Sequence, residues 1–305
     1  MKKIFTILIC LIVFQFATAQ KKMTLTYFQN DTLRLDLDLF VPDKKWETKL
    51  PLVIYVHGGG FSGGDRSAGE TFCKYLANNG YAAATISYTL YMKGKNFGCD
   101  GALPEKIKAF QLGANDLWLA TSFFIGNSHK YNIDDTKIFI SGSSAGAETA
   151  LHAAFWDVKT MAIYPNVLPE NFKYAGLISG AGAIMDLNLI TAKNSIPVFL
   201  FHGSGDTVVP YGTSAHHFCK PTASNWLMLF GSHSIYDHLL SLDQSAALYT
   251  FCGGGHEYSN NLFVKDSQYL LSFLNETLTG KKNQNHTMVS TGKKNAISAV
   301  YKFCD

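Results

Sequence analysis

The sequence lacks the patterns that hold metals and nucleotide phosphates. Its 305 residues contain no C-x-x-C and no H-E-x-x-H, which excludes two common zinc-ligand spacings. There is no G-x-x-x-x-G-K-[ST], which excludes a P-loop. Gly58, Gly60 and Gly63 have the spacing of a dinucleotide fingerprint, but the next expected strand ends at Thr89 without the acid that binds ribose. We therefore expect no metal and no cofactor.

The body of the chain also lacks an excess of basic charge. The formal net charge is +3, but residues 1–19 carry two lysines and residues 281–305 carry five lysines against one aspartate. The residues between these ends are net negative. Nucleic-acid binding needs a basic patch, so we expect no nucleic-acid partner. The composition does not define an oligomeric state.

The first 19 residues have the pattern of a secretion signal. Lys2 and Lys3 precede an apolar run over residues 4–16, which is short for a membrane span. Ala17-Thr18-Ala19 then resembles a signal-peptidase site. We expect cleavage after Ala19 and a secreted or periplasmic protein with no stable membrane span. The alternative is an uncleaved anchor.

Gly142-Ser143-Ser144-Ala145-Gly146 is the most informative stretch of the chain. It reads G-x-S-x-G, follows the apolar run Lys137–Ser141 and precedes the helix-like run Ala147–Ala154. Strand, tight turn and helix is the context in which a serine nucleophile is exposed above a sheet. The alternative is an ordinary turn rich in serine and glycine. The context favours Ser144 as the nucleophile, with the Ala145 N–H as an oxyanion donor.

A second glycine-rich loop follows another apolar strand. His57-Gly58-Gly59-Gly60 comes after Leu52–Val56. Glycines allow backbone N–H groups to approach a substrate oxygen, so Gly59 and Gly60 are the expected further oxyanion donors. We expect His57 to brace this loop. Phe61 is a candidate wall of the substrate pocket.

Two late loops supply a candidate acid and base. Asp206 lies in H-G-S-G-D-T-V-V-P after the strand Ile196–Phe201, and His256 lies in G-G-G-H-E after the strand Ala246–Phe251. The order Ser144, Asp206, His256 is that of α/β-hydrolases, unlike the orders of chymotrypsin and subtilisin. Asp186 is a rival acid, but it follows an earlier strand.

Strands and helices alternate along the body, which predicts an α/β fold with a mostly parallel sheet covered by helices on both faces. We expect eight strands, the first two as an antiparallel hairpin over Lys22–Gln29 and Thr32–Phe40. The catalytic domain is expected to span residues 20–280. Residues 281–305 are polar and are expected to form an appendage, although the apolar stretch Ala296–Phe303 is an alternative added strand.

These motifs together resemble an esterase-type α/β-hydrolase over residues 25 to 280. The HGGG stretch is similar to the hormone-sensitive-lipase branch, and the H-G-x-x-D-x-x-V-P stretch around Asp206 is similar to dienelactone-hydrolase and prolyl-oligopeptidase relatives. Both occur in secreted bacterial carboxylesterases that include feruloyl and acetyl-xylan esterases. Ser143 stands where the lipase branch has an acid.

The resemblance implies a serine esterase that forms an acyl-enzyme on Ser144, with His256 as base and Asp206 as its partner. Its substrates would be short acyl or aryl-acyl esters, including carbohydrate-linked ones. A prolyl-oligopeptidase-type peptidase is the alternative enzyme, and a binding module without catalysis is a third possibility. The glycine-rich stretch Tyr91–Gly101 is either a pocket wall or an ordinary crossover loop.

Five cysteines remain after cleavage at Ala19: Cys73, Cys99, Cys219, Cys252 and Cys304. Export permits disulfides, and an odd number leaves at least one cysteine free or paired between chains. Cys219 and Cys252 flank the Asp206 and His256 loops, so a bridge between them is one expectation. Isolated buried thiols are the alternative.

The signal sequence leads to a direct prediction. Protein exported by a bacterial host should begin at Gln20, because the small residues Ala17 and Ala19 fit the peptidase site. N-terminal sequencing of the exported protein checks this. An intact Met1 on the exported protein would instead identify an uncleaved anchor.

Overall fold

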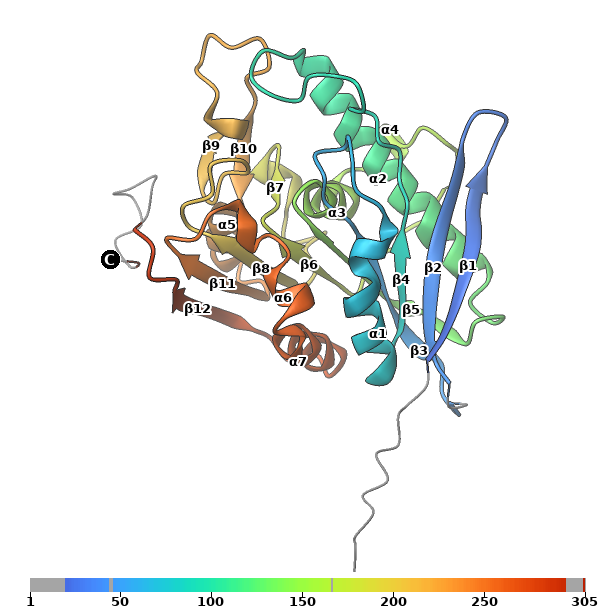
Figure 1. Cartoon of the computed structure of the whole chain (residues 1–305). Helices are drawn as coiled ribbons and strands as arrows, with labels where there is room; N and C mark the ends of the chain where they lie inside the picture. The colour runs from blue at the N-terminus through green and yellow to red at the C-terminus, as the bar shows by residue number, and fades with distance from the viewer. Residues whose placement is uncertain (1–19, 44–45, 166, 295–303, 305) are drawn as a thin grey trace, which may run out of the picture.

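The computed structural model describes residues 20–43, 46–165, 167–294 and 304. The expected signal peptide and the alternative strand Ala296–Phe303 lie outside the described residues. Nine strands of the described part form one sheet in the order β1-β2-β4-β3-β5-β6-β8-β11-β12 (Figure 1). β2 is antiparallel to both its neighbours, and every other neighbouring pair is parallel.

The strands of this sheet are β1 (Gln20–Gln29), β2 (Arg34–Pro42), β3 (Leu50–Val56), β4 (Ala82–Ile86), β5 (Ile133–Ser143), β6 (Gly176–Gly180), β8 (Val198–Gly203), β11 (Ala246–Cys252) and β12 (Gln284–Ser290). A small second sheet contains β7 (Ala183–Ile184), β9 (Thr213–Ala215) and β10 (Met228–Gly231). The helices are α1 (Glu70–Asn78), α2 (Leu103–Gly126), α3 (Ala145–Phe155), α4 (Val158–Met161), α5 (Ser232–Ser241), α6 (Asn261–Val264) and α7 (Ser267–Leu278).

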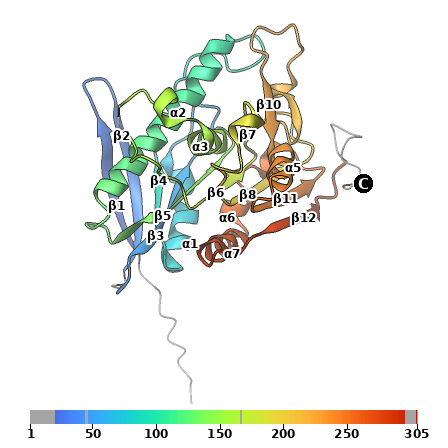
Figure 2. The same ribbon diagram turned by 180° about the vertical axis from the view of Figure 1, so that it is seen from behind.

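Helices cover both faces of the large sheet, as the unbroken apolar runs of its central strands predict. The buried residues of α2, α3 and α5 belong to the hydrophobic core on one face. Those of α1, α6 and α7 belong to the core on the other face. The views from the two sides show these two layers (Figures 1 and 2). The α/β class and the initial antiparallel hairpin are therefore confirmed.

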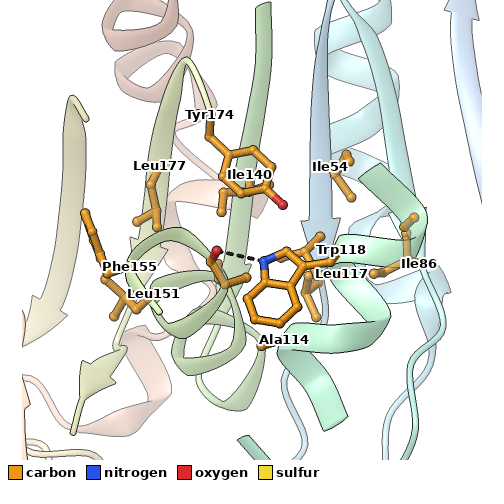
Figure 3. Packing of buried hydrophobic residues seen from close by; sticks show 14 of the residues in the cluster. Ile54, Ile86, Ala114, Leu117, Trp118, Ile140, Leu151, Phe155, Tyr174 and Leu177 are labelled. Atoms are coloured by element: carbon orange, nitrogen blue, oxygen red, sulfur yellow. Dashed lines mark hydrogen bonds between the residues drawn. The ribbon is translucent and has the colours of Figure 1, made fainter. Parts of the chain in front are cut away.

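The contact between α2 and α3 is the best example of how the core is closed. Trp118 of α2 is fully buried, and its indole Nε1 donates a hydrogen bond of 2.9 Å to the Ala153 carbonyl of α3. Figure 3 shows this bond among Leu117, Ile140 and Tyr174. The bond satisfies the one polar atom of a large apolar side chain, so Trp118 packs without leaving a buried donor unpaired. It also fixes α3, the helix that follows Ser144.

The prediction of eight strands is wrong, because the segment expected as an appendage contributes a ninth. β12 pairs in parallel with β11 from Ala246 opposite Gln284 to Cys252 opposite Ser290. Its side chains are mostly exposed, as expected for a strand at the edge of the sheet. A polar sequence can form such an edge strand, because the backbone hydrogen bonds to the neighbouring strand do not require apolar side chains.

The expected Cys219–Cys252 bridge is also wrong. Cys219 pairs with Cys99, and Cys252 pairs with Cys304. Cys73 is free and buried. The first bridge joins the Tyr91–Gly101 loop to the segment after Asp206, and the second holds the end of β11. Among the described residues, no helix is both long and apolar enough for a membrane crossing.

The sheet brings the functional loops to one edge. β3, β5, β8 and β11 are parallel to one another, so their carboxyl ends lie on the same side of the sheet. The loops that leave these ends carry Gly58–Gly60, Ser144, Asp206 and His256. This is the edge at which open α/β sheets bind ligands.

Replacement of Gly146 by alanine should destabilise the fold by about 3 kcal/mol or more. A Cβ at Gly146 would lie 2.1 Å from the Val56 carbonyl oxygen and 2.6 Å from that of His57, so α3 would have to move from β3. Urea unfolding measures the effect. Gly126→Ala is the matched control, because a Cβ there meets nothing within 4 Å. Equal stabilities of the two variants would contradict the close approach at Gly146.

Candidate active site

Ser144 occupies a strained turn between β5 and α3. Its backbone has φ 53° and ψ −126°, a region that residues other than glycine rarely adopt. The Ser144 N–H donates to the Gly180 carbonyl at 2.7 Å, which holds the turn against β6. This bond and the close contacts of the neighbouring glycines compensate the backbone strain of Ser144. The turn therefore holds the Ser144 hydroxyl at the start of α3. There it faces the carboxyl edge of the sheet.

The structure brings Ser144, His256 and Asp206 into one hydrogen-bonded chain. Ser144 Oγ lies 2.7 Å from His256 Nε2, and His256 Nδ1 lies 2.7 Å from Asp206 Oδ2. These three residues come from positions up to 112 residues apart. A carboxylate on Nδ1 favours the tautomer in which Nδ1 carries hydrogen, so Nε2 is free to accept the serine proton.

Asp206 is fully buried and accepts four hydrogen bonds. Oδ1 accepts from the N–H groups of Val208 and Val209 at 2.8 and 3.1 Å, and Oδ2 accepts from His256 and from His202 Nε2 at 2.7 and 3.1 Å. Burial by itself would raise the pKa of Asp206, but the bonds from His202 and His256 outweigh it and hold the pKa well below its ordinary value. Asp206 is therefore ionised throughout the physiological range.

His202 is a contributor that the sequence analysis missed. Its Nε2 faces two acceptors, Asp206 Oδ2 and the Val209 carbonyl at 3.2 Å, so this nitrogen carries a hydrogen. Its Nδ1 lies 2.9 Å from Ser232 Oγ, within hydrogen-bond distance. The sequence signal that could have identified His202 is its position four residues before Asp206 in H-G-S-G-D. The rival acid Asp186 instead accepts a hydrogen bond from the Asn188 N–H and does not line the pocket.

The HGGG loop places its backbone beside Ser144. Gly59 and Gly60 have φ of 118° and 60°, which favour glycine. No hydrogen bond in the described part of the chain occupies the N–H groups of Gly59, Gly60 or Ala145. His57 braces the loop as expected, because its Nδ1 donates to the Gly58 carbonyl at 2.7 Å. The N–H groups of Gly59, Gly60 and Ala145 can donate hydrogen bonds to an oxygen that develops negative charge next to Ser144.

A pocket of about 380 Å³ opens at these residues, and Phe61 does not line it. Phe61 has φ 56° and is fully buried below the pocket, where its ring packs edge-on at 5.5 Å from that of Phe97. The prediction for Phe61 is therefore wrong, since the backbone turn directs its side chain into the core. Phe97 from the Tyr91–Gly101 loop is the aromatic wall, so that loop does border the pocket.

Buried and half-buried polar side chains form another wall of the pocket. Glu148, His216 and His217 line it beside Ser144 and His256. Burial raises the pKa of Glu148 to about 8, although Lys106 opposes the shift and Asp206 adds to it. Burial, together with Lys106 and His256, lowers the pKa of His217 to about 4. We did not expect Glu148 here, although it lies one helical turn after Ser144.

Comparisons with known proteins show which families and folds this chain resembles. The BD-FAE family model matches residues 37–182, just under half of the chain, which include the HGGG loop and Ser144. Among solved structures, the butyrate-bound esterase of the Planctomycetes species Thermogutta terrifontis has a TM-score of 0.62 at 16% identity. It covers 85% of this chain and 94% of its own. The propionate-bound form has a TM-score of 0.60 with the same identity and coverage. This likeness shows the α/β-hydrolase fold.

Two of the curated relatives at the sequence level are named as esterases. Gut esterase 1 of Caenorhabditis elegans is 33% identical over 124 residues, which are 40% of this chain and 20% of that protein. A probable isoprenylcysteine alpha-carbonyl methylesterase of Oryza sativa subsp. japonica is 25% identical over 222 residues, 60% of this chain and 49% of that protein. The chain thus spans half or less of the length of these relatives.

Glu148→Gln should change how stability depends on pH. The pKa of Glu148 is about 8 in the folded protein and roughly 4.3 in an unfolded chain. The neutral Glu148 carboxyl therefore stabilises the folded state fully below the pKa of the unfolded chain. This stabilisation is lost as the pH rises through the folded-state pKa of about 8. Relative to Glu148→Gln, the wild-type Tm should fall between about pH 5 and pH 8.5.

Calorimetry across this range measures the difference. Glu257→Gln is the control, because Glu257 is exposed and Lys293 lowers its pKa, so this variant should gain nothing at high pH. Parallel Tm profiles of the wild type and Glu148→Gln would contradict a buried neutral carboxyl.

Proposed function

We propose that this protein is a secreted serine esterase that cleaves carboxylic esters through an acyl-enzyme on Ser144. The observation that carries the proposal is the chain of two 2.7 Å contacts from Ser144 through His256 to Asp206. Three backbone N–H groups that have no hydrogen bond within the described residues stand beside it, and the named relatives are esterases. A module that only binds ligands would need neither the strained serine nor the ionised aspartate.

The chemistry follows from this geometry. His256 Nε2 takes the proton of Ser144 as Oγ attacks the ester carbonyl, and Asp206 stabilises the imidazolium that forms. The N–H groups of Gly59, Gly60 and Ala145 stabilise the oxyanion, each contributing about 3 kcal/mol to the transition state. His256 then gives its proton to the leaving alcohol. Water attacks the acyl-enzyme with His256 again as base, which releases the acid and restores Ser144.

The size of the pocket supports short substrates. Its volume of about 380 Å³ is near the lower end for small-molecule sites. The structurally similar Thermogutta terrifontis esterase has been solved with propionate and with butyrate. We infer a preference for short acyl or aryl-acyl esters, including carbohydrate-linked ones. The expected export would place such substrates outside the cytoplasm.

Peptidase activity is the alternative enzyme class. The H-G-S-G-D-T-V-V-P stretch suggested it, but none of the relatives named above is a peptidase. Esters and amides use the same acyl-enzyme chemistry, so only relative rates separate the two classes.

Labelling by a fluorophosphonate probe tests the nucleophile. The wild type should be labelled, Ser144→Ala should not, and Ser143→Ala should still be labelled because His256 Nε2 contacts Ser144 Oγ. Turnover of Ser144→Ala should fall by a factor of about 10³ or more, and His256→Ala and Asp206→Asn should also lose orders of magnitude. Labelling of Ser144→Ala would overturn the assignment.

A series of p-nitrophenyl esters tests the substrate class. kcat/KM should peak at short acyl chains and fall beyond about eight carbons, because the pocket has little room for longer chains. Feruloyl esters and aminoacyl amides complete the panel. A maximum at long chains would contradict the pocket argument, and faster cleavage of amides than of any ester would favour a peptidase.

A further inference from the structure

The polar wall of the pocket has atoms that nothing in the described protein satisfies. Glu148 Oε1, His216 Nδ1 and His217 Nε2 are buried and have no hydrogen-bond partner there. The side chains of Glu148 and His216 are each only 1% exposed. Glu148 Oε1 lies 3.4 Å from His216 Nε2, an approach without a formed hydrogen bond. Buried polar atoms are nearly always paired in folded proteins, so an unpaired group that lines a pocket indicates ligand binding.

The backbone around this wall is strained and is held by cross-links. His217 and Phe218 have φ of 57° and 52°, which non-glycine residues rarely adopt in succession. The Cys99–Cys219 disulfide anchors the segment that follows. The Asn225 side chain adds hydrogen bonds to the carbonyls of Phe97 and Gly98, at 3.1 and 2.6 Å. Strain that is maintained by its surroundings is typical of functional positions.

The wall offers hydrogen bonds without formal charge. Burial raises the pKa of Glu148 and lowers those of both histidines, so all three side chains are neutral near pH 7. A protonated carboxyl and two neutral imidazoles each present a donor and an acceptor. Lys106, the buried cation that faces Glu148 from α2, does not line the pocket and donates to the Asn225 carbonyl at 3.0 Å. A hydroxyl group, which also donates and accepts, is the matching ligand.

We propose that Glu148, His216 and His217 form a subsite that selects esters bearing a free hydroxyl group near the cleaved bond. The subsite rests on the esterase function proposed above, because it shares a pocket with Ser144 and His256. An ester with a plain alkyl group in this position leaves the three polar groups unpaired in its bound state. Such an ester is therefore disfavoured relative to its hydroxylated counterpart.

Matched pairs of esters test the proposal. One pair differs in the acyl group, p-nitrophenyl butyrate against p-nitrophenyl 3-hydroxybutyrate. The other differs in the alcohol, propyl acetate against glyceryl monoacetate. Wild-type kcat/KM should favour the hydroxylated member of at least one pair by roughly tenfold or more. The ratio within a pair does not depend on the concentration of active enzyme, so partial misfolding of a variant leaves it interpretable.

Variants of the wall should change that ratio. Glu148→Leu and His216→Phe remove hydrogen-bonding groups and should bring the ratio close to one. Glu148→Gln keeps a donor and an acceptor and should retain most of the preference. Glu257→Leu is the control, because Glu257 adjoins His256 but is exposed and lies outside the pocket lining. It should leave the ratio at its wild-type value.

The outcomes separate the two proposals. Equal wild-type rates within both pairs, or an unchanged ratio in Glu148→Leu and His216→Phe, would overturn the hydroxyl subsite while leaving the esterase intact. Stronger preference for a carboxylate-bearing ester, such as a succinate half-ester, would also overturn it and would assign an anion site near Lys106. Absence of cleavage for every ester would overturn the esterase function itself.

Discussion

The buried carboxylate of Asp206 is the constraint on which the rest of the site depends. A charge with no exposed surface is tolerated only when every lone pair is compensated. The compensating groups come from His202 at the end of β8, from the backbone of Val208 and Val209, and from His256 after β11. Further hydrogen bonds join the same loops, from the Gly205 N–H to the Gly254 carbonyl and from the Gly253 N–H to Ser204 Oγ. The hydrogen bonds that compensate the Asp206 carboxylate thus also position the His256 imidazole. The turn at Ser144 then only has to bring its hydroxyl within hydrogen-bond distance of His256 Nε2.

The fold class and the residues brought together at the sheet edge were predictable for one physical reason. Parallel strands end on the same side of a sheet, so motifs that each follow an apolar strand must meet there. Part of the G-x-S-x-G pattern required no knowledge of long-range packing, because its first glycine avoids a clash within the motif itself. A Cβ at Gly142, for example, would lie 2.3 Å from the Gly146 carbonyl oxygen.

The errors concern features that depend on packing between distant segments. The disulfides join cysteines 120 and 52 residues apart, and such pairings depend on which loops meet in space. β12 has no apolar periodicity because it is an exposed edge strand. Phe61 follows the HGGG loop, but its backbone conformation turns the ring into the core and leaves the pocket wall to Phe97. Glu148 was not identified as a pocket residue, although helical geometry places it on the same face as Ser144.

The position of β11 near the end of the chain has a consequence for biosynthesis. Ser144 and the HGGG loop belong to the first half of the chain, whereas His256 follows β11, which lies between β8 and β12. β11 becomes an interior strand only when residues 284–290 pair with it, and the end of β11 is tethered only when Cys304 is present. A nascent chain that has emerged only as far as α3 therefore carries Ser144 without His256 or Asp206. The contacts that join Ser144, His256 and Asp206 can therefore form only after synthesis has passed residue 256, long after the turn at Ser144 has emerged.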